Sequence, residues 1–165
     1  MLTLPDTAQV LLIGAGATAV MDLWLLLLKR AGVPTGSFTM VGRWVGHLAR
    51  GRVTHAAITK ADPVAHELAL GWLVHYAVGA GFAALLVALQ GAAWLARPSF
   101  VPALLFGIAT VVLPLFVMQP AMGAGFASSK TATPLANRLR SVANHAVFGL
   151  GLYGAAALLS SFNHP

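Results

Sequence analysis

The sequence predicts an all-α membrane protein that crosses the bilayer four times. Of its 165 residues, 58% are hydrophobic and only 8% are charged, whereas an average soluble domain has roughly 25% charged residues. Four apolar stretches are each close to the roughly 20 residues that a helix needs to span a bilayer. This composition excludes a water-soluble enzyme, a secreted domain and a disordered chain.

The four predicted spans belong to one domain that covers residues 1–165. They run over residues 8–28, 71–95, 100–119 and 142–159, and residues 29–62 form the one long connection. Trp72 and Trp94 lie near the two ends of the second span, as expected of an aromatic belt at the membrane interfaces.

The basic residues predict how the chain is oriented in the membrane. Nine of the ten Lys and Arg residues fall in or beside the connections after the first and third spans, and only Arg97 lies between the second and third. The positive-inside rule then places both basic connections in the cytoplasm and both termini in the periplasm. An inverted partner copy would need balanced loops, so we expect any homo-oligomer to be parallel.

Residues 41–50, within the long connection, predict an amphipathic helix at the membrane interface. At helical spacing, two sets of side chains lie on opposite faces. One face carries Val41, Trp44, Val45 and Leu48, and the other carries Arg43, His47 and Arg50. Basic residues in this position attract anionic lipid, so we expect Arg43, Arg50 and Trp44 to contact lipid headgroups. A solvated basic loop is the alternative.

An internal repeat relates the two halves of the chain. Residues 61–68 and 132–139 share Ala, Pro, Ala and Leu at matching positions, and a His-x-x-x-Gly-x-Gly pattern follows at His75 and again at His145. A weaker match pairs Ala17-Thr18 of the first span with Ala109-Thr110 of the third. These matches predict a duplicated helical hairpin with a parallel pseudo-two-fold axis. Chance similarity between apolar helices is the alternative.

Two Pro residues predict where the second and fourth helices begin. Asp62 and Thr133 are good N-cap residues, and the Pro that follows each of them suits the first helical position. We therefore expect these helices to start at Pro63 and Pro134. In the third span, Pro114 removes a helical hydrogen bond and should kink the helix.

Five polar side chains near the cytoplasmic ends of the spans are candidates for a binding site: Asp22, His75, Gln119, Asn144 and His145. An ionisable side chain in a span is costly and normally faces the bundle interior. At roughly 1.5 Å per residue, Asp22 and the two histidines share one level of the membrane. A carboxylate beside imidazoles can bind a cation or pass protons near neutral pH.

These side chains allow three functions. We expect the protein to bind or transport a small solute or ion, and this transport could be coupled to protons. The same residues could instead hold helices together in a structural or assembly subunit. Asp22, His75 and His145 could also ligate a metal or haem, although the sequence requires no cofactor.

Other classes of function are not favoured. The chain has no nucleophile elbow, phosphate loop or kinase signature, so an enzyme is not expected. The formal charge of +6 is spread between apolar runs rather than over a soluble basic module. Membrane lipid, and not nucleic acid, is therefore the expected partner.

Four segments carry a resemblance to a known family: Gly16–Trp24, Val41–His47, Leu70–Tyr76 and Met118–Phe126. They resemble the bacterial family of small integral membrane proteins called domain of unknown function 2938 (DUF2938), and the resemblance covers nearly the whole chain. It implies an inner-membrane protein with a four-helix domain. It implies no assigned activity and no catalytic residues.

Overall fold

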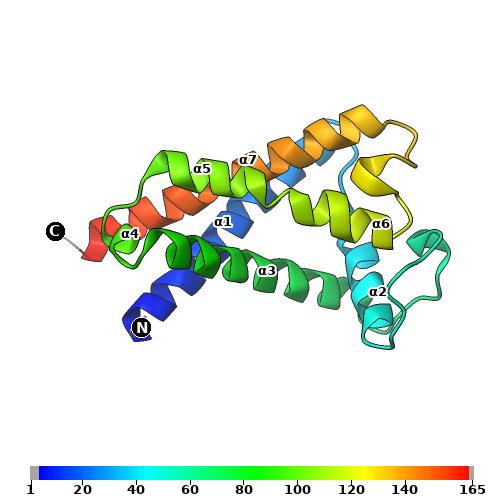
Figure 1. Cartoon of the computed structure of the whole chain (residues 1–165), viewed down its shortest axis with the longest axis horizontal. Coiled ribbons are helices and arrows are strands. Elements are labelled where there is room, and N and C mark those ends of the chain that lie inside the picture. The colour runs from blue at the N-terminus through cyan, green and yellow to red at the C-terminus, as the bar shows by residue number, and fades with distance from the viewer. Residues whose placement is uncertain (1–3, 164–165) are drawn as a thin grey trace. The chain divides into compact units, whose positions relative to one another are not determined.

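The computed structural model describes residues 4–163, and all regular secondary structure within them is helical (Figure 1). The long helices are α1 (Leu4–Arg30), α3 (Glu67–Gln90) and α7 (Pro134–Asn163). The third apolar stretch is divided into α5 (Phe100–Ala109), a π-helical turn η2 (Pro114–Met118) and α6 (Gln119–Ala121). The shorter elements are α2 (Phe38–Leu48), α4 (Ala93–Ala96) and the 3₁₀ turns η1 (Ile58–Lys60) and η3 (Phe126–Ser128).

Four stretches are long and apolar enough to cross a membrane. They are Asp6–Arg30, Glu67–Gln90, Phe100–Ala121 and Pro134–Phe162. Only 22–28% of the most apolar window of each stretch is buried inside the protein. Such extensive apolar surface is compatible with lipid and not with water. The all-α prediction with four candidate spans is therefore confirmed, and it indicates a multi-pass membrane protein.

The chain forms two compact units. The first comprises the described residues up to 34 together with 76–110 and 143–163, and the second comprises residues 35–75 and 111–142. Helices α3 and α7 contribute residues to both units, because the divisions fall after His75 and after Val142.

Small residues let the helices of the first unit approach one another at backbone distance. Helix α1 meets α3 where Gly14 lies against the backbone of Ala80, and α5 meets α7 where Gly107 lies against Gly149. Helices α5 and α7 accordingly run side by side in Figure 1. Around these contacts lies one apolar core, whose buried members include Ile13, Leu86, Val87, Phe148 and Leu152.

In the second unit, α2 packs against α3 through the face that carries its glycines and His47. Its buried residues are Gly42, Gly46 and His47, while Leu48 is 40% exposed. A Cβ atom on Gly42 would collide with the carbonyl group of Glu67, so α2 and α3 cross at their backbones. The prediction that the basic face of this helix turns toward lipid is wrong for His47. The small-residue face permits the closer packing, and His47 finds a hydrogen-bond partner inside the unit.

Several helix ends differ from the predicted ones. Helix α7 begins at Pro134, as predicted, but α3 begins at Glu67 instead of Pro63. His66 just before it has a left-handed φ of 56°, which a helix cannot contain. Helix α3 ends at Gln90 instead of Leu95, because Gly91 takes a φ of 85°. Trp94 consequently lies in α4, where it is buried and does not form part of an exposed aromatic belt.

Pro114 interrupts the third apolar stretch, as predicted. Regular α-helical structure ends at Ala109, and the π-helical turn η2 starts at Pro114. Proline has no N–H to donate, so the helical hydrogen-bond pattern cannot continue unchanged through this position.

Candidate functional site

Asp22 is held by a tyrosine on another helix of the first unit. The hydroxyl group of Tyr76 on α3 donates a hydrogen bond of 2.9 Å to a carboxylate oxygen of Asp22 on α1. Asp22 is half-buried and Tyr76 is 37% exposed, so the pair lies at the edge of the unit rather than in its core. Sequence analysis identified Asp22 but missed Tyr76, although this tyrosine directly follows the candidate His75.

The packing of α1 on α3 explains why these two side chains meet. Gly14 contacts the backbone of α3 at Gly79 and Ala80, and Thr18 lies against Gly79. Thr18 turns its hydroxyl group back to the carbonyl oxygen of Gly14, at 2.8 Å. Asp22 follows one turn after Thr18 on the same face of α1, where it reaches Tyr76, about one turn before Gly79 on α3.

Asn144 joins α7 to α1. Its side-chain carbonyl oxygen accepts a hydrogen bond of 3.0 Å from the indole N–H of Trp24. Asn144 therefore lies in the first unit with Asp22, but its described partner is an indole and not the carboxylate. Trp24 was not among the candidate residues, because a tryptophan near a membrane interface needs no polar partner inside the protein.

His145 joins α7 to α5. Its Nδ1 atom lies 2.7 Å from the hydroxyl oxygen of Thr110, and this hydroxyl donates its only proton to the carbonyl oxygen of Gly107, at 2.5 Å. Because the Thr110 proton is already used, Nδ1 of His145 must carry a proton and donate it.

His75 and Gln119 lie in the second unit, with other partners. The ring of His75 packs 4.5 Å from that of Phe38 and 6.0 Å from that of Trp72, measured between ring centroids. The side-chain oxygen of Gln119 accepts a hydrogen bond of 2.7 Å from Ser128, which is buried. Of the five predicted site residues, Asp22, Asn144 and His145 thus share the first unit, and His75 and Gln119 share the second.

An ion pair in the second unit links α2 to the start of α3. Arg43 donates two parallel hydrogen bonds of 2.8 Å to the two carboxylate oxygens of Glu67 and a third, of 3.1 Å, to the carbonyl oxygen of Ala61. Glu67 also accepts the backbone N–H of Val64. The hydrogen bonds to Glu67 raise the pKa of the Arg43 guanidinium above its usual value.

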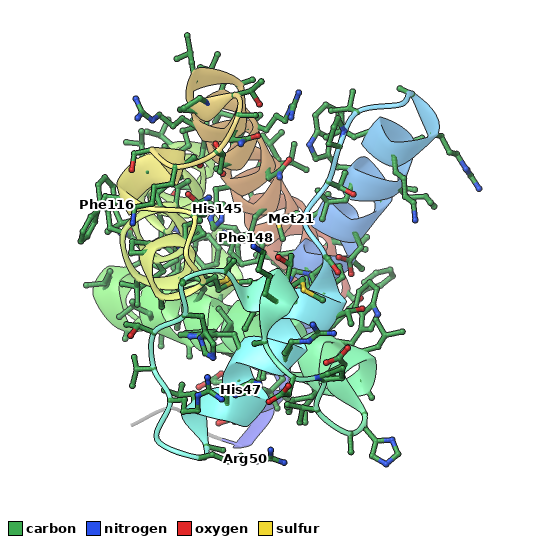
Figure 2. All side chains as sticks on the ribbon, turned by 90° about the vertical axis from the view of Figure 1, so that its right-hand side faces the viewer. Met21, His47, Arg50, Phe116, His145 and Phe148 are labelled. Atoms are coloured by element: carbon green, nitrogen blue, oxygen red, sulfur yellow. The ribbon has the colours of Figure 1, made fainter. Side chains whose placement is uncertain are left out.

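The three residues expected to contact lipid headgroups, Arg43, Trp44 and Arg50, have different surroundings. The side chain of Arg43 is only 11% exposed and is paired with Glu67. Trp44 is half-buried and donates its indole N–H to the carbonyl oxygen of Val53, at 2.9 Å. Arg50, just past the end of α2, is exposed, and Figure 2 shows it beyond His47 at the outer end of this segment.

A metal-binding cluster is not seen in the described part of the chain. Among residues 4–163, no three His, Cys, Asp or Glu side chains are grouped so that they could hold a metal ion. Asp22 and His145 lie in the first unit and His75 in the second.

Comparison with known proteins identifies the family. The family model described as protein of unknown function (DUF2938) matches residues 11–159 of the chain. Neither a curated protein nor a solved structure is similar enough to be matched. The resemblance seen in the sequence is confirmed: four candidate membrane spans and a family match over nearly the whole length show that this chain belongs to the DUF2938 family.

Proposed function

We propose that this DUF2938 protein is a multi-pass protein of the bacterial cytoplasmic membrane that binds and moves a small cation, coupled to protons, with Asp22 as the charged site. The observation that carries the proposal is the hydrogen bond between Asp22 and Tyr76, on two neighbouring helices of the first unit. A carboxylate within a span is costly, so it is usually retained for a function.

The surroundings of Asp22 suit reversible proton or cation binding. The tyrosine hydroxyl donates a hydrogen bond to the carboxylate, and both residues are only partly buried. A cation or a proton can neutralise this charge in turn, which is the basis of coupled exchange. His145 lies in the same unit, where its Nδ1 atom pairs with the Thr110 hydroxyl group.

The proposed orientation places the connections after the first and third spans in the cytoplasm and both termini in the periplasm. Seven of the ten Lys and Arg residues, but only two of the four acidic residues, lie in the second unit. Because basic segments are retained in the cytoplasm, this distribution supports the orientation. In such a protein any homo-oligomer would be parallel.

We also propose that the four spans arose by duplication of a helical hairpin. Gly79 and Gly149 occupy matching positions in the two sequence repeats, and each lies at the contact of its helix with the preceding span. Thr18 and Thr110 also match, and each hydroxyl donates to a carbonyl oxygen in the preceding turn. These corresponding contacts support a parallel repeat.

A second candidate function is that of a structural or assembly subunit. It is favoured by the observation that Asp22, Asn144 and His145 each have a hydrogen bond to another helix. Interhelical hydrogen bonds of this kind stabilise membrane bundles without any ligand. The two candidates differ in what removal of the Asp22 charge does to a folded protein.

Proton flux in liposomes tests the proposal. The purified protein would be reconstituted with a pH-sensitive dye inside, and Na⁺ or K⁺ gradients would be imposed from outside. We expect one of these cations to drive proton counterflow in the wild type, Asp22→Asn to abolish it, and Tyr76→Phe to shift its pH dependence. Asp62→Asn, the same change at an exposed residue outside the candidate spans, is the matched control.

The outcome separates the two candidates. If Asp22→Asn is folded and carries the same flux as the wild type, Asp22 is not the site of transport. If the wild type carries no flux with either cation, proton-coupled transport of Na⁺ and K⁺ is excluded. A helix-joining role for Asp22 would then appear only as a lower unfolding midpoint in both Asp22→Asn and Tyr76→Phe.

A further inference from the structure

A small cavity lies in the loop that follows α2, within the second unit. It has a volume of about 260 Å³ and is lined by residues between 52 and 61. Its polar side chains are those of Arg52, Thr54, His55 and Lys60, and the remaining lining residues are alanines. The lining thus combines two permanent cations with donor groups and contains no carboxylate.

The two cations have no internal counter-charge. Among residues 4–163, neither Arg52 nor Lys60 forms an ion pair or a side-chain hydrogen bond. Of the two acidic residues in this unit, Glu67 is held by Arg43. The other, Asp62, directly follows a lining residue, is exposed and forms no ion pair within the described part of the chain. Two like charges placed around one cavity repel each other, so the arrangement is unfavourable until an anion enters.

The loop that forms the cavity is fixed in place by backbone contacts. The backbone N–H of His55 donates to the carbonyl oxygen of Ala121, at 2.8 Å, and that of Ile58 donates to Met122, at 3.0 Å. Gly123, with a φ of 92°, packs directly against the carbonyl group of Ala56. These contacts with the end of α6 preorganise the cavity, and preorganisation lowers the cost of binding a ligand.

His55 forms part of the wall and has unsatisfied polar atoms. Both of its ring nitrogens are buried and have no hydrogen-bond partner within the protein. Its ring lies edge-on to that of His47, 4.9 Å between centroids, and His47 is bonded through Nε2 to the backbone oxygen of Asp62. Burial first, and then the neighbouring His47 and Arg52, lower the pKa of His55. The neutral ring has one N–H donor and one acceptor nitrogen, and a buried N–H without a partner is rare in proteins and calls for an acceptor.

From the cavity, its two uncompensated cations and the unsatisfied imidazole, we infer that this loop binds a phosphate-bearing anion. Arg52 is suited to bind two phosphate oxygens at once, and Lys60 adds a compact charge from the same lining. The Thr54 hydroxyl and a ring N–H of His55 are the further donors. The small volume fits a phosphate group with a short substituent, which describes both the headgroup of an anionic phospholipid and a free phosphate.

Two binding measurements distinguish these sources. Equilibrium dialysis of the purified protein in a maltoside detergent would measure binding of radiolabelled inorganic phosphate. Native mass spectrometry of protein released from nanodiscs of mixed phosphatidylglycerol and phosphatidylcholine would measure retained lipid. The test variant is Arg52→Gln with Lys60→Gln, and the matched control is Arg50→Gln together with Lys130→Gln, which removes the same charge from exposed residues that do not line the cavity.

We expect the test variant to bind the anion at least about tenfold more weakly than the wild type, and the control to bind within about twofold of it. Loss of inorganic phosphate binding identifies a free phosphate as the ligand, and loss of phosphatidylglycerol adducts alone identifies a lipid headgroup. If the wild type binds neither probe, or if the control variant weakens binding as much as the test variant, the cavity is not an anion site. Neither result depends on the cation flux proposed for Asp22.

Discussion

At the residue scale, Thr110 determines which nitrogen of His145 carries the proton. The threonine hydroxyl donates a hydrogen bond to the carbonyl oxygen of Gly107 and accepts one from His145, so it links the end of α5 to α7. We expect Thr110→Val to lower the free energy of unfolding by about 1 kcal/mol, because a half-buried imidazole N–H loses its acceptor while the side-chain volume is kept. Unfolding in mixed micelles with increasing SDS measures this change.

Thr110→Ser is the control for this prediction. Serine keeps the hydroxyl group and removes only a methyl group, so the hydrogen bonds to Gly107 and His145 can form as before. If Thr110→Ser destabilises the protein more than Thr110→Val does, packing and not hydrogen bonding is the contribution of this residue.

At the scale of helices, glycines that look alike in the sequence have opposite roles. Gly14 on α1 lies against the backbone of Ala80, whereas a Cβ atom on Gly81 of α3 would meet open space. We expect Gly14→Ala to separate α1 from α3 and to destabilise the protein by about 1–3 kcal/mol. Gly81→Ala should be neutral or stabilising by up to about 1 kcal/mol, because alanine is the better helix former.

Thermal unfolding of the two variants in the same detergent checks this pair of predictions. Separation of the helices should also lengthen or break the hydrogen bond between Asp22 and Tyr76, since both side chains depend on this crossing. A Gly14→Ala variant as stable as the wild type would mean that α1 and α3 do not pack at this position.

Helix positions that depend on local sequence signals could be predicted, whereas features that depend on packing between helices could not. Span positions follow from runs of apolar residues, and the start of α7 follows from Thr133 and Pro134, which are local signals. The buried face of α2 does not follow from its apolar residues, because contact at Gly42 with the backbone of α3 and the pairing of Arg43 with Glu67 decide it. Tyr76 was missed for the same reason, since only the packing of α1 on α3 brings it to Asp22.

At the scale of the whole molecule, the prediction concerns which connections between the spans lie on which side of the membrane. The chain contains no cysteine, so a single introduced thiol is unambiguous. Ser99, between α4 and α5, and Ser129, between η3 and α7, are both exposed and are expected on opposite sides. In intact cells, a membrane-impermeant maleimide should label Ser99→Cys and leave Ser129→Cys unlabelled until the membrane is opened. The reverse pattern would place the termini in the cytoplasm.

The interrupted third span also bears on how the protein meets bilayers of different thickness. The span Asp6–Arg30 is one unbroken helix of 25 residues, whose length of about 38 Å exceeds the roughly 30 Å of hydrocarbon. It can accommodate this mismatch by tilting as a rod. The stretch Phe100–Ala121 carries the π-helical turn at Pro114, where proline donates no hydrogen bond to the preceding turn and helices commonly bend. A thinner membrane is therefore expected to tilt the first span and to bend the third at this single turn.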